Sequence, residues 1–273
     1  MEIEFTVGTQ SVVLTDYGRL KDGRMGDLAP QTTLETWRVG GQLVKSAYRQ
    51  EKRALDLPFL FKAATETALL ANVQTILSVL SAGEGTLRVT RNDGTVRELY
   101  RCYYVAGLGE KGWLKVAEAV LSFDALDPYW YSTVPTIEVF ASGSVVSFFP
   151  FFPLLLTSSS IVERKTINNP GLIAWPFWSI YGPGLNPSII NHTTGEQLTL
   201  NCSLSASDIL TIDTSPLAKT VQINGANAYQ YLTAASVLFG LLPGDNDISV
   251  QMNIITAGIS AGSAMYYPRY ISP

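Results

Sequence analysis

Residues 123–132 read FDALDPYWYS, and the character of the chain changes at this stretch. The first 130 residues hold 15 basic and 16 acidic side chains, whereas the remaining 143 hold 4 and 7. Charged residues therefore make up about 24% of the first part and about 8% of the second, against about 25% in an average soluble domain. A shift of this size predicts a domain boundary near residues 128–160.

The part before this boundary has the pattern of an α+β domain. One helix is predicted from Thr65 to Ala82, because apolar residues recur there every three or four positions and Gly83 follows. The segment RNDGT at 91–95 predicts a tight hairpin turn, since glycine tolerates positive φ. We expect residues 1–132 to form a mostly β domain in which one helix packs on a sheet or split barrel. Its strand-like runs are 2–7, 33–39, 53–61, 86–90, 96–105 and 114–123.

The part after the boundary has the pattern of an all-β sandwich. Short β-branched runs alternate with turn-forming stretches such as NNPG, GPGLNP, NHTTGE and LPGDND. A spacing of about 8 to 12 residues between strands is typical of two packed antiparallel sheets. We expect this sandwich over residues 161–273. The predicted strands are 136–141, 161–168, 175–181, 188–191, 197–200, 209–213, 220–224, 236–241 and 248–255.

Residues 133–160 are expected to be a linker or an extended arm. The apolar stretch VVSFFPFFPLLL at 145–156 is broken by two prolines and is shorter than the about 20 apolar residues of a membrane-spanning helix. We therefore expect no membrane span. Its phenylalanines are candidate anchors for a neighbouring copy or a partner, with folding onto the chain's own sandwich as the alternative. These are Phe148, Phe149, Phe151 and Phe152.

Composition excludes several classes of protein. The net charge of −4 argues against binding to nucleic acid or an anionic membrane, because phosphate neutralisation needs clustered basic residues. Cys102 and Cys202 stand alone, so two isolated thiols are expected rather than a zinc site or a disulfide framework. The acidic start MEIEFTVGTQ is unlike a signal peptide. A charged fraction of only 15% is typical of a sticky, heavily buried or assembled protein.

Motifs for catalysis and cofactor binding are missing from the sequence. The single histidine, His192, lies in the turn NHTTGE without a nucleophile signature nearby, and no phosphate-binding glycine loop is present. The close carboxylate pairs are Asp124 with Asp127 and Asp245 with Asp247, and each pair has an ordinary role in a turn as its alternative. We expect no enzyme activity, no cofactor and no metal.

A strand at 175–181 carries three aromatic residues in alternation. Trp175 and Phe177 are expected on one face and Trp178 on the other. Core packing is the simpler explanation, and sugar stacking by Trp175 and Phe177 is the alternative.

The series of motifs from residue 123 onward resembles the distal tail proteins of long, non-contractile tailed bacteriophages, the siphovirus tail-component family. In order, the motifs are FDALDPYWYS, NNPGLIAWPFWSIYGPGLNPSIINHTTGEQL, LTIDTS, VQINGAN and LFGLLPGDNDISV. The N-terminal third matches mainly in its pattern of short strands around one helix. The junction motif comprises Asp127, Pro128, Tyr129, Trp130 and Tyr131, which we expect to stop a strand and clamp one domain against the other.

The resemblance implies a structural hub of a phage tail tip or baseplate. Six copies would form a ring of N-terminal domains around the DNA channel, with galectin-like C-terminal sandwiches outside. The implied partners are other copies of the chain, the tail tube protein, a tail-tip or tail-associated protein and receptor-binding proteins, without sequence-specific binding of nucleic acid. The chain would be assembled in the cytoplasm of the bacterial host and reside in the virion.

Two other functions compete with the hub. The first is a carbohydrate-binding or adhesin module, which exposed Trp175 and Phe177 beside unpaired Asn or Asp side chains would favour. The second is a glycan-degrading enzyme that uses two of the four carboxylates named above, which requires that they share a cleft.

Overall fold

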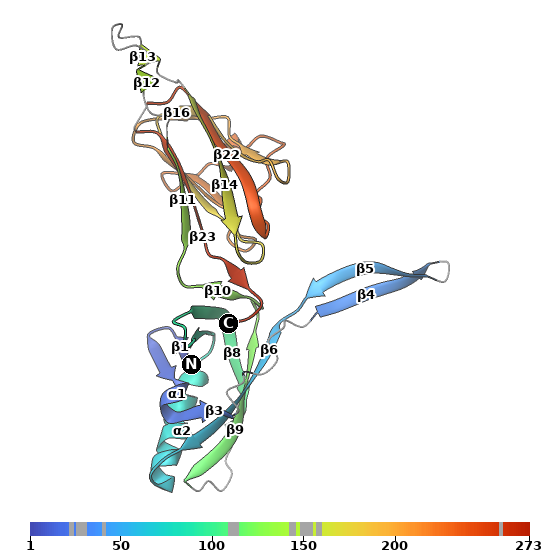
Figure 1. Ribbon diagram of the computed structural model, residues 1–273, viewed down its shortest axis with the longest axis vertical. Coiled ribbons are helices and arrows are strands. Elements are labelled where there is room, and N and C mark those ends of the chain that lie inside the picture. The colour runs from blue at the N-terminus through green and yellow to red at the C-terminus, as the bar shows by residue number, and fades with distance from the viewer. Residues whose placement is uncertain are drawn as a thin grey trace. The chain divides into compact units, whose positions relative to one another are not determined.

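The computed structural model describes residues 1–21, 25, 32–39, 42–108, 115–141, 146–147, 155–156, 160–256 and 259–273. The chain divides into two compact units (Figure 1). Unit 1 comprises Met1–Thr133 together with Arg269–Pro273, and unit 2 comprises Val134–Pro268. The chain therefore passes between the units twice, and its last five residues return to unit 1.

Unit 1 is built on a nine-stranded antiparallel sheet. Its main path runs β2-β1-β7-β8-β9-β6-β3, and β10 lies beside β8 with β24 as its other neighbour. Helix α2 packs against β1 and β2. A four-residue helix, α1, connects β2 to β3 and was not expected from the sequence. The elements are β1 (Glu2–Val7), β2 (Gln10–Val13), α1 (Leu14–Tyr17), β3 (Gly18–Leu20), β6 (Arg53–Lys62), α2 (Glu66–Leu80), β7 (Gly85–Thr90), β8 (Val96–Ala106), β9 (Val116–Ala125), β10 (Trp130–Ser132) and β24 (Arg269–Tyr270).

Local chemistry explains where α2 begins and ends. The Thr65 hydroxyl accepts a hydrogen bond from the Ala68 N–H at 3.1 Å, which satisfies one of the free donors of the first turn. At the other end the Ser81 hydroxyl donates to the Leu77 carbonyl. The apolar face of the helix is buried in the core of unit 1 through Leu69, Val73, Ile76, Val79 and Leu80. The helix predicted from residues 65 to 82 is confirmed.

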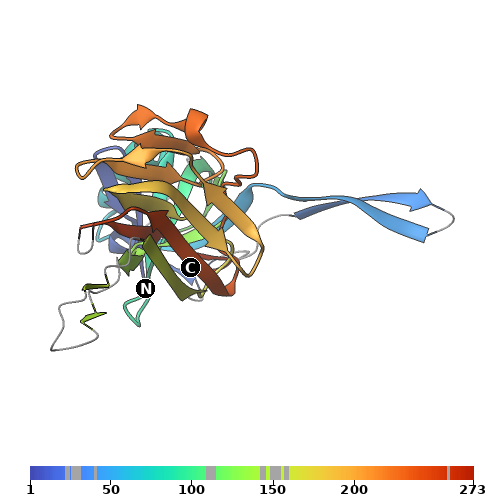
Figure 2. The ribbon, with the colours of Figure 1, turned by 90° about the horizontal axis from the view of Figure 1, so that it is seen from above.

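A two-stranded hairpin forms a sheet of its own within unit 1. Strands β4 (Thr32–Val39) and β5 (Gln42–Gln50) pair with each other, and no other described strand joins them (light blue in Figures 1 and 2). A lone two-stranded hairpin is marginally stable in water. Packing against something further is therefore expected for this hairpin.

Unit 2 is a sandwich of two antiparallel sheets around one core. One sheet has the order β11-β23-β15-β19-β20-β21, and the other has β14-β22-β16-β17 with β18 beside β16. The turn between β20 and β21 holds Asn224 and Gly225, both at positive φ, as the Asn-Gly dipeptide predicts. The strands are β11 (Thr136–Ala141), β14 (Ser160–Asn169), β15 (Phe177–Tyr181), β16 (Gly184–Asn191), β17 (Glu196–Thr199), β18 (Ser203–Leu204), β19 (Ile209–Asp213), β20 (Thr220–Ile223), β21 (Ala226–Asn227), β22 (Gly244–Asn253) and β23 (Ala261–Tyr266).

The core of unit 2 draws side chains from both sheets. Trp178 of β15 is fully buried, and its ring lies 6.1 Å from Phe140 of β11 and 6.4 Å from Phe239. Ile189 of β16 and Val250 of β22 belong to the same buried cluster. The mostly β fold class, with an antiparallel sandwich in the C-terminal part, is confirmed.

The structure differs from the sequence expectations in three places within or beside unit 2. The predicted strand at 236–241 is not formed, because only Leu241 makes a bridge, to Ala174. The strand predicted at 136–141 is formed, but it is an edge strand of the six-stranded sheet rather than part of the expected linker 133–160. Residues 269–273, expected in the sandwich, pair in unit 1 because β24 adds to β10.

The remaining short elements complete the described residues. Strands β12 (Val146–Ser147) and β13 (Leu155–Leu156) pair with each other, and a 3₁₀ turn, η2, covers Tyr229–Tyr231. No helix in the described ranges is both long and apolar enough to cross a lipid bilayer.

Candidate functional site

The junction motif forms a short strand between two others in unit 1. Trp130 of β10 pairs with Leu99 of β8 on one side and with Tyr270 of β24 on the other. The Trp130 side chain is fully buried within the core of unit 1. Strand β10 therefore links the main sheet to the C-terminal strand of the chain.

A buried arginine holds both of the segments that meet here. Arg53 of β6 is fully buried, and its Nε donates to the Pro128 carbonyl at 2.7 Å. Its Nη2 donates to the Ile271 carbonyl at 2.6 Å. A charged group is placed in a protein interior only when its hydrogen bonds are satisfied. Arg53 thus fixes the backbone just before β10 and just after β24.

The sequence carries a signal for Arg53 that our interpretation missed. In β6 the buried positions alternate with the others, and Arg53 is in phase with Leu55, Leu57, Phe59 and Phe61. A charged residue on the inward face of an alternating strand indicates a buried charge with dedicated partners.

Arginine and tyrosine side chains cover the junction. The Arg269 guanidinium lies 4.6 Å from the ring centroid of Tyr129 and 6.0 Å from that of Tyr131, and the Arg97 guanidinium lies 3.7 Å from that of Tyr270. At these distances a cation is attracted to the face of an aromatic ring. The C-terminal strand β24 is therefore held in unit 1 by side-chain contacts as well as by backbone pairing.

Asp127 organises the start of the same strand. One of its oxygens accepts from the Tyr131 hydroxyl at 2.7 Å, and the other accepts from the Tyr129 N–H at 3.3 Å. Burial, together with the hydrogen bond to Asp127, raises the pKa of Tyr131 to about 12. Tyr131 therefore stays protonated at neutral pH and acts as a hydrogen-bond donor. These residues are brought together as a clamp within unit 1, and their role between the two units remains a prediction.

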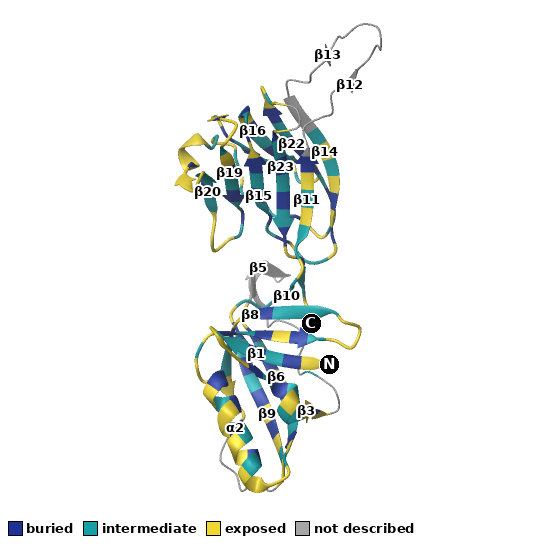
Figure 3. Ribbon diagram, turned by 90° about the vertical axis from the view of Figure 1, so that its left-hand side faces the viewer, coloured by how far each residue is buried: buried dark blue, intermediate teal, exposed yellow. Residues whose placement is uncertain are grey.

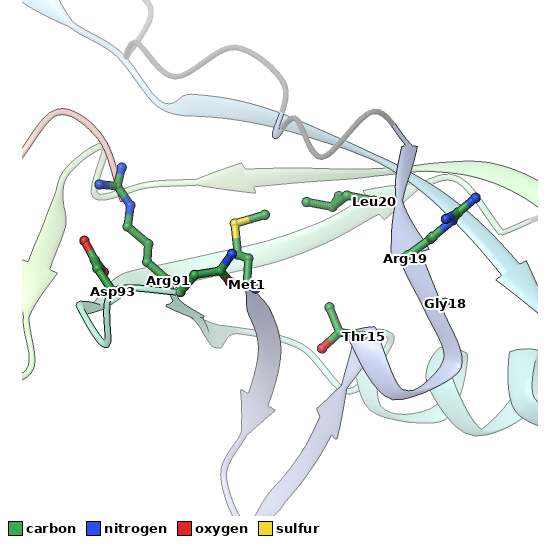
Figure 4. A pocket seen from close by; sticks show the side chains of 8 residues that line it. Met1, Thr15, Gly18, Arg19, Leu20, Arg91 and Asp93 are labelled. Carbon is green, nitrogen blue, oxygen red and sulfur yellow. Dashed lines mark hydrogen bonds between the residues drawn. The ribbon is translucent and has the colours of Figure 1, made fainter.

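Two cavities flank strand β3. The larger, of about 720 Å³, is drawn in Figure 4, and it shares Thr15, Gly18 and Arg19 as lining residues with the smaller, of about 580 Å³. In the larger cavity the N-terminal ammonium of Met1 donates to the Asn92 amide oxygen. Its lining residues include one carboxylate and no histidine or cysteine. The ionisable groups of this lining are the Asp93 carboxylate, the N-terminal ammonium and the guanidinium groups of Arg19 and Arg91.

The four carboxylates named from the sequence each have an identified partner. Asp124 pairs with Lys52 at 2.5 Å, and Asp245 accepts from the Asn168 amide at 2.7 Å. Asp247 accepts a bidentate pair of hydrogen bonds from Arg164, which lowers the pKa of that carboxyl below its usual value. Asp127 is engaged as described above. Within the described ranges no three His, Cys, Asp or Glu side chains gather into a possible metal site.

The histidine and the two cysteines occupy structural positions in the fold. His192 is exposed, and its Nε2 lies 2.9 Å from the Ser249 hydroxyl. The backbone N–H of His192 donates to the backbone carbonyl of Asp247. Both cysteines are free. Burial raises the pKa of Cys102 to about 12 and raises that of Cys202 as well, so neither is a thiolate at neutral pH.

The three aromatic residues near β15 differ in burial. Trp178 is buried in the core, whereas Phe177 is half-buried on the opposite face of the strand, and Trp175 is half-buried in the segment that precedes β15. Neither Trp175 nor Phe177 is therefore a core residue. The candidate interface residues Phe148, Phe149, Phe151 and Phe152 lie outside the described residues.

Comparison with known proteins gives two kinds of match. Residues 174–270 match the family model described as siphovirus-type tail component, C-terminal domain. The fold of the chain is similar to the crystal structure of SPP1 Dit, described as a paradigm of the hub adsorption apparatus in phages that infect Gram-positive bacteria. The TM-score is 0.70 at 13% identity, over 98% of this chain and 99% of that one.

Weaker similarity extends to a baseplate component. Two structures of the phage P2 baseplate in its activated conformation, one with Ca and one with Sr, give TM-scores of 0.45 and 0.44 at 10% identity, each over 97% of both chains. Comparison with curated protein sequences gives no significant match. The predicted resemblance is confirmed, because residues 174–270 match the C-terminal domain model of the siphovirus-type tail component family.

Proposed function

We propose that this protein is a structural hub of a siphovirus tail tip or baseplate. The observation that carries the proposal is the fold similarity to SPP1 Dit over nearly the whole of both chains, joined to the family match at residues 174–270. The side chains described above form clamps, cores and ion pairs, which suit a scaffold. The proposed role requires no chemistry, cofactor or metal of its own.

The finer proposal is a ring of six copies around the DNA channel, with unit 1 forming the ring and unit 2 lying outside it. The hairpin β4–β5 supports assembly through unit 1, because it pairs with no other described strand and needs a packing partner. The low charged fraction of 15% also suits a subunit that is buried against neighbours. Closed rings are built from head-to-tail interfaces, in which one surface of each copy contacts a different surface of the next.

The partners in this proposal are the tail tube protein, a tail-tip or tail-associated protein and receptor-binding proteins. The segment between β11 and β14, residues 142–159, is proposed to contribute an arm, with Phe148, Phe149, Phe151 and Phe152 as contacts. The protein would assemble in the cytoplasm of the bacterial host and reside in the virion.

The test is the mass of the purified protein by light scattering, together with immunogold labelling of phage particles. A ring of six copies of 29.7 kDa has a mass of about 178 kDa, and labelling is expected at one end of the tail. A stable mass of another multiple, in solution and when mixed with the tail tube protein, would contradict six-fold assembly. Particles without label would contradict the hub itself.

A further inference from the structure

The outer face of the six-stranded sheet of unit 2 carries little charge and many apolar side chains. Ile137 and Val139 of β11 are 59% and 51% exposed, and Tyr181 of β15 and Ile209 of β19 are 41% and 38% exposed. Figure 3 shows the strands β11, β23, β15 and β19 side by side, coloured by burial. The remaining members of this face are half-buried. They are Phe177, Ser179, Thr211, Asp213, Thr220, Gln222, Ala261, Ser263 and Met265. We call these thirteen residues the apolar sheet face.

The register of the strands makes this face continuous. Ile137 lies opposite Met265, which lies opposite Phe177, so three apolar side chains cross three neighbouring strands. At the other end of these strands, Tyr181 of β15 lies opposite Ile209 of β19. Between these rows the face carries hydroxyl groups, and its one charged side chain is Asp213.

The outer face of the other sheet in the same unit has ordinary surface chemistry. Arg164 pairs with Asp247 across β14 and β22, and Asn168 donates to Asp245. His192 lies against Ser249 on the same side. The scarcity of charge is therefore confined to one face of the sandwich. Exposed apolar patches of this kind mark interaction surfaces in soluble proteins.

The size of the apolar sheet face limits what occupies it. Five strands about 4.8 Å apart, each contributing about five residues at about 3.3 Å, give a footprint of about 400 Å². A stable interface buries about 800 Å² on each partner. A second copy on this face alone would fall short, whereas a subunit of a larger assembly is held at several sites at once.

The chemistry of the face also limits its partner. A charged surface would lose its hydration here and find one carboxylate to pair with. The serine, threonine and glutamine side chains of the face offer hydrogen bonds to a glycan, but Ile137, Val139 and Met265 offer none, so one side of the face suits an apolar partner better than a ring of sugar hydroxyls. An apolar, uncharged protein surface is the complementary occupant.

We propose that the apolar sheet face docks an apolar, uncharged surface of a second kind of tail protein. The inference rests on the proposed function, because it takes the partner from the tail assembly. It adds the surface and the residues through which unit 2 binds that partner.

The test is the protein composition of phage particles that carry Val139→Lys or Ile209→Lys. The matched control is Thr166→Lys, which places the same charge on an exposed position of the other sheet, opposite Asp247. We expect both face variants to enter particles at the wild-type copy number while one other tail protein falls at least about tenfold by quantitative mass spectrometry. The control is expected to retain every tail protein.

The other outcomes separate the possible failures. Unchanged composition in both face variants overturns the proposal. Unchanged composition with reduced adsorption to cells also overturns it and assigns the face to a host ligand such as a glycan. Loss of the variant chain itself, with the control incorporated, assigns the face to contacts between copies. Absence of the wild-type chain from particles overturns the proposed function instead.

Discussion

Replacing Arg53 with alanine tests whether this residue holds the C-terminal strand in unit 1. The change removes two charge-assisted hydrogen bonds, to the carbonyls of Pro128 and Ile271, each worth about 1.5–3 kcal/mol. Relief from burying the guanidinium offsets part of this loss, because placing a charge in the interior is costly. We expect a net loss of about 3 kcal/mol in the local stability of the segments that Arg53 joins.

Hydrogen exchange followed by mass spectrometry measures this loss where it occurs. A loss of about 3 kcal/mol predicts exchange about a hundredfold faster in peptides that cover 128–132 and 269–273. The control is Lys52→Ala, since Lys52 makes an exposed ion pair with Asp124 that contributes about 1 kcal/mol or less. Arg53→Lys keeps the charge without the two-pronged geometry and is expected to fall between them.

Unchanged exchange at 269–273 in Arg53→Ala would refute this reasoning. It would mean that backbone pairing of β24 with β10, and the contacts of Arg97 and Arg269 with tyrosine rings, suffice to hold the strand. Equal acceleration in every peptide of unit 1 would also count against it, because it would assign Arg53 to global stability.

Three further predictions address the junction, the ring and the arm. The pKa of Tyr131 is raised to about 12 in the folded state, so its contribution to stability is complete below about pH 10 and is lost as the pH rises toward 12. Tyr131→Phe should remove this pH dependence of stability in denaturation measurements at high pH. Persistence of the dependence in the variant would contradict the assignment to Tyr131. Replacing residues 32–50 with a short Gly-Ser linker should convert the ring to monomers by light scattering, and an intact ring would show that β4–β5 is dispensable. Deleting residues 148–153 should leave the ring mass unchanged and weaken attachment of a tail partner in virions, whereas loss of the ring would assign this segment to the ring interface.

Much of the fold was predictable because local signals agreed with one another. The apolar period of α2 and the cap at Thr65 mark the helix, and the Asn-Gly turn at 224–225 marks a hairpin. The strand predicted at 236–241 failed because β-branched and apolar residues also line buried loops, as Leu241 does. Local pattern does not distinguish these two environments.

The junction was predictable only in part. The sequence marked residues 127–131, but the return of β24 to unit 1 depends on a pairing between Tyr131 and Arg269, which are far apart along the chain. No local pattern specifies such a partner. Arg53 could have been identified from the sequence, because it places a charged residue on the otherwise apolar inward face of β6.

The structure shows on which surface charged residues are scarce in the second half of the chain. From composition alone, scarce charge indicates a surface that assembly buries, without saying where that surface is. In unit 2 the outer face of one sheet carries the Arg164–Asp247 pair, and the other outer face carries Asp213 as its one charge. A sandwich that needed only solubility would place charges on both outer faces. The asymmetry therefore supports the proposed docking role of the apolar sheet face, and it makes Val139→Lys a sharper probe of assembly than any change to the core.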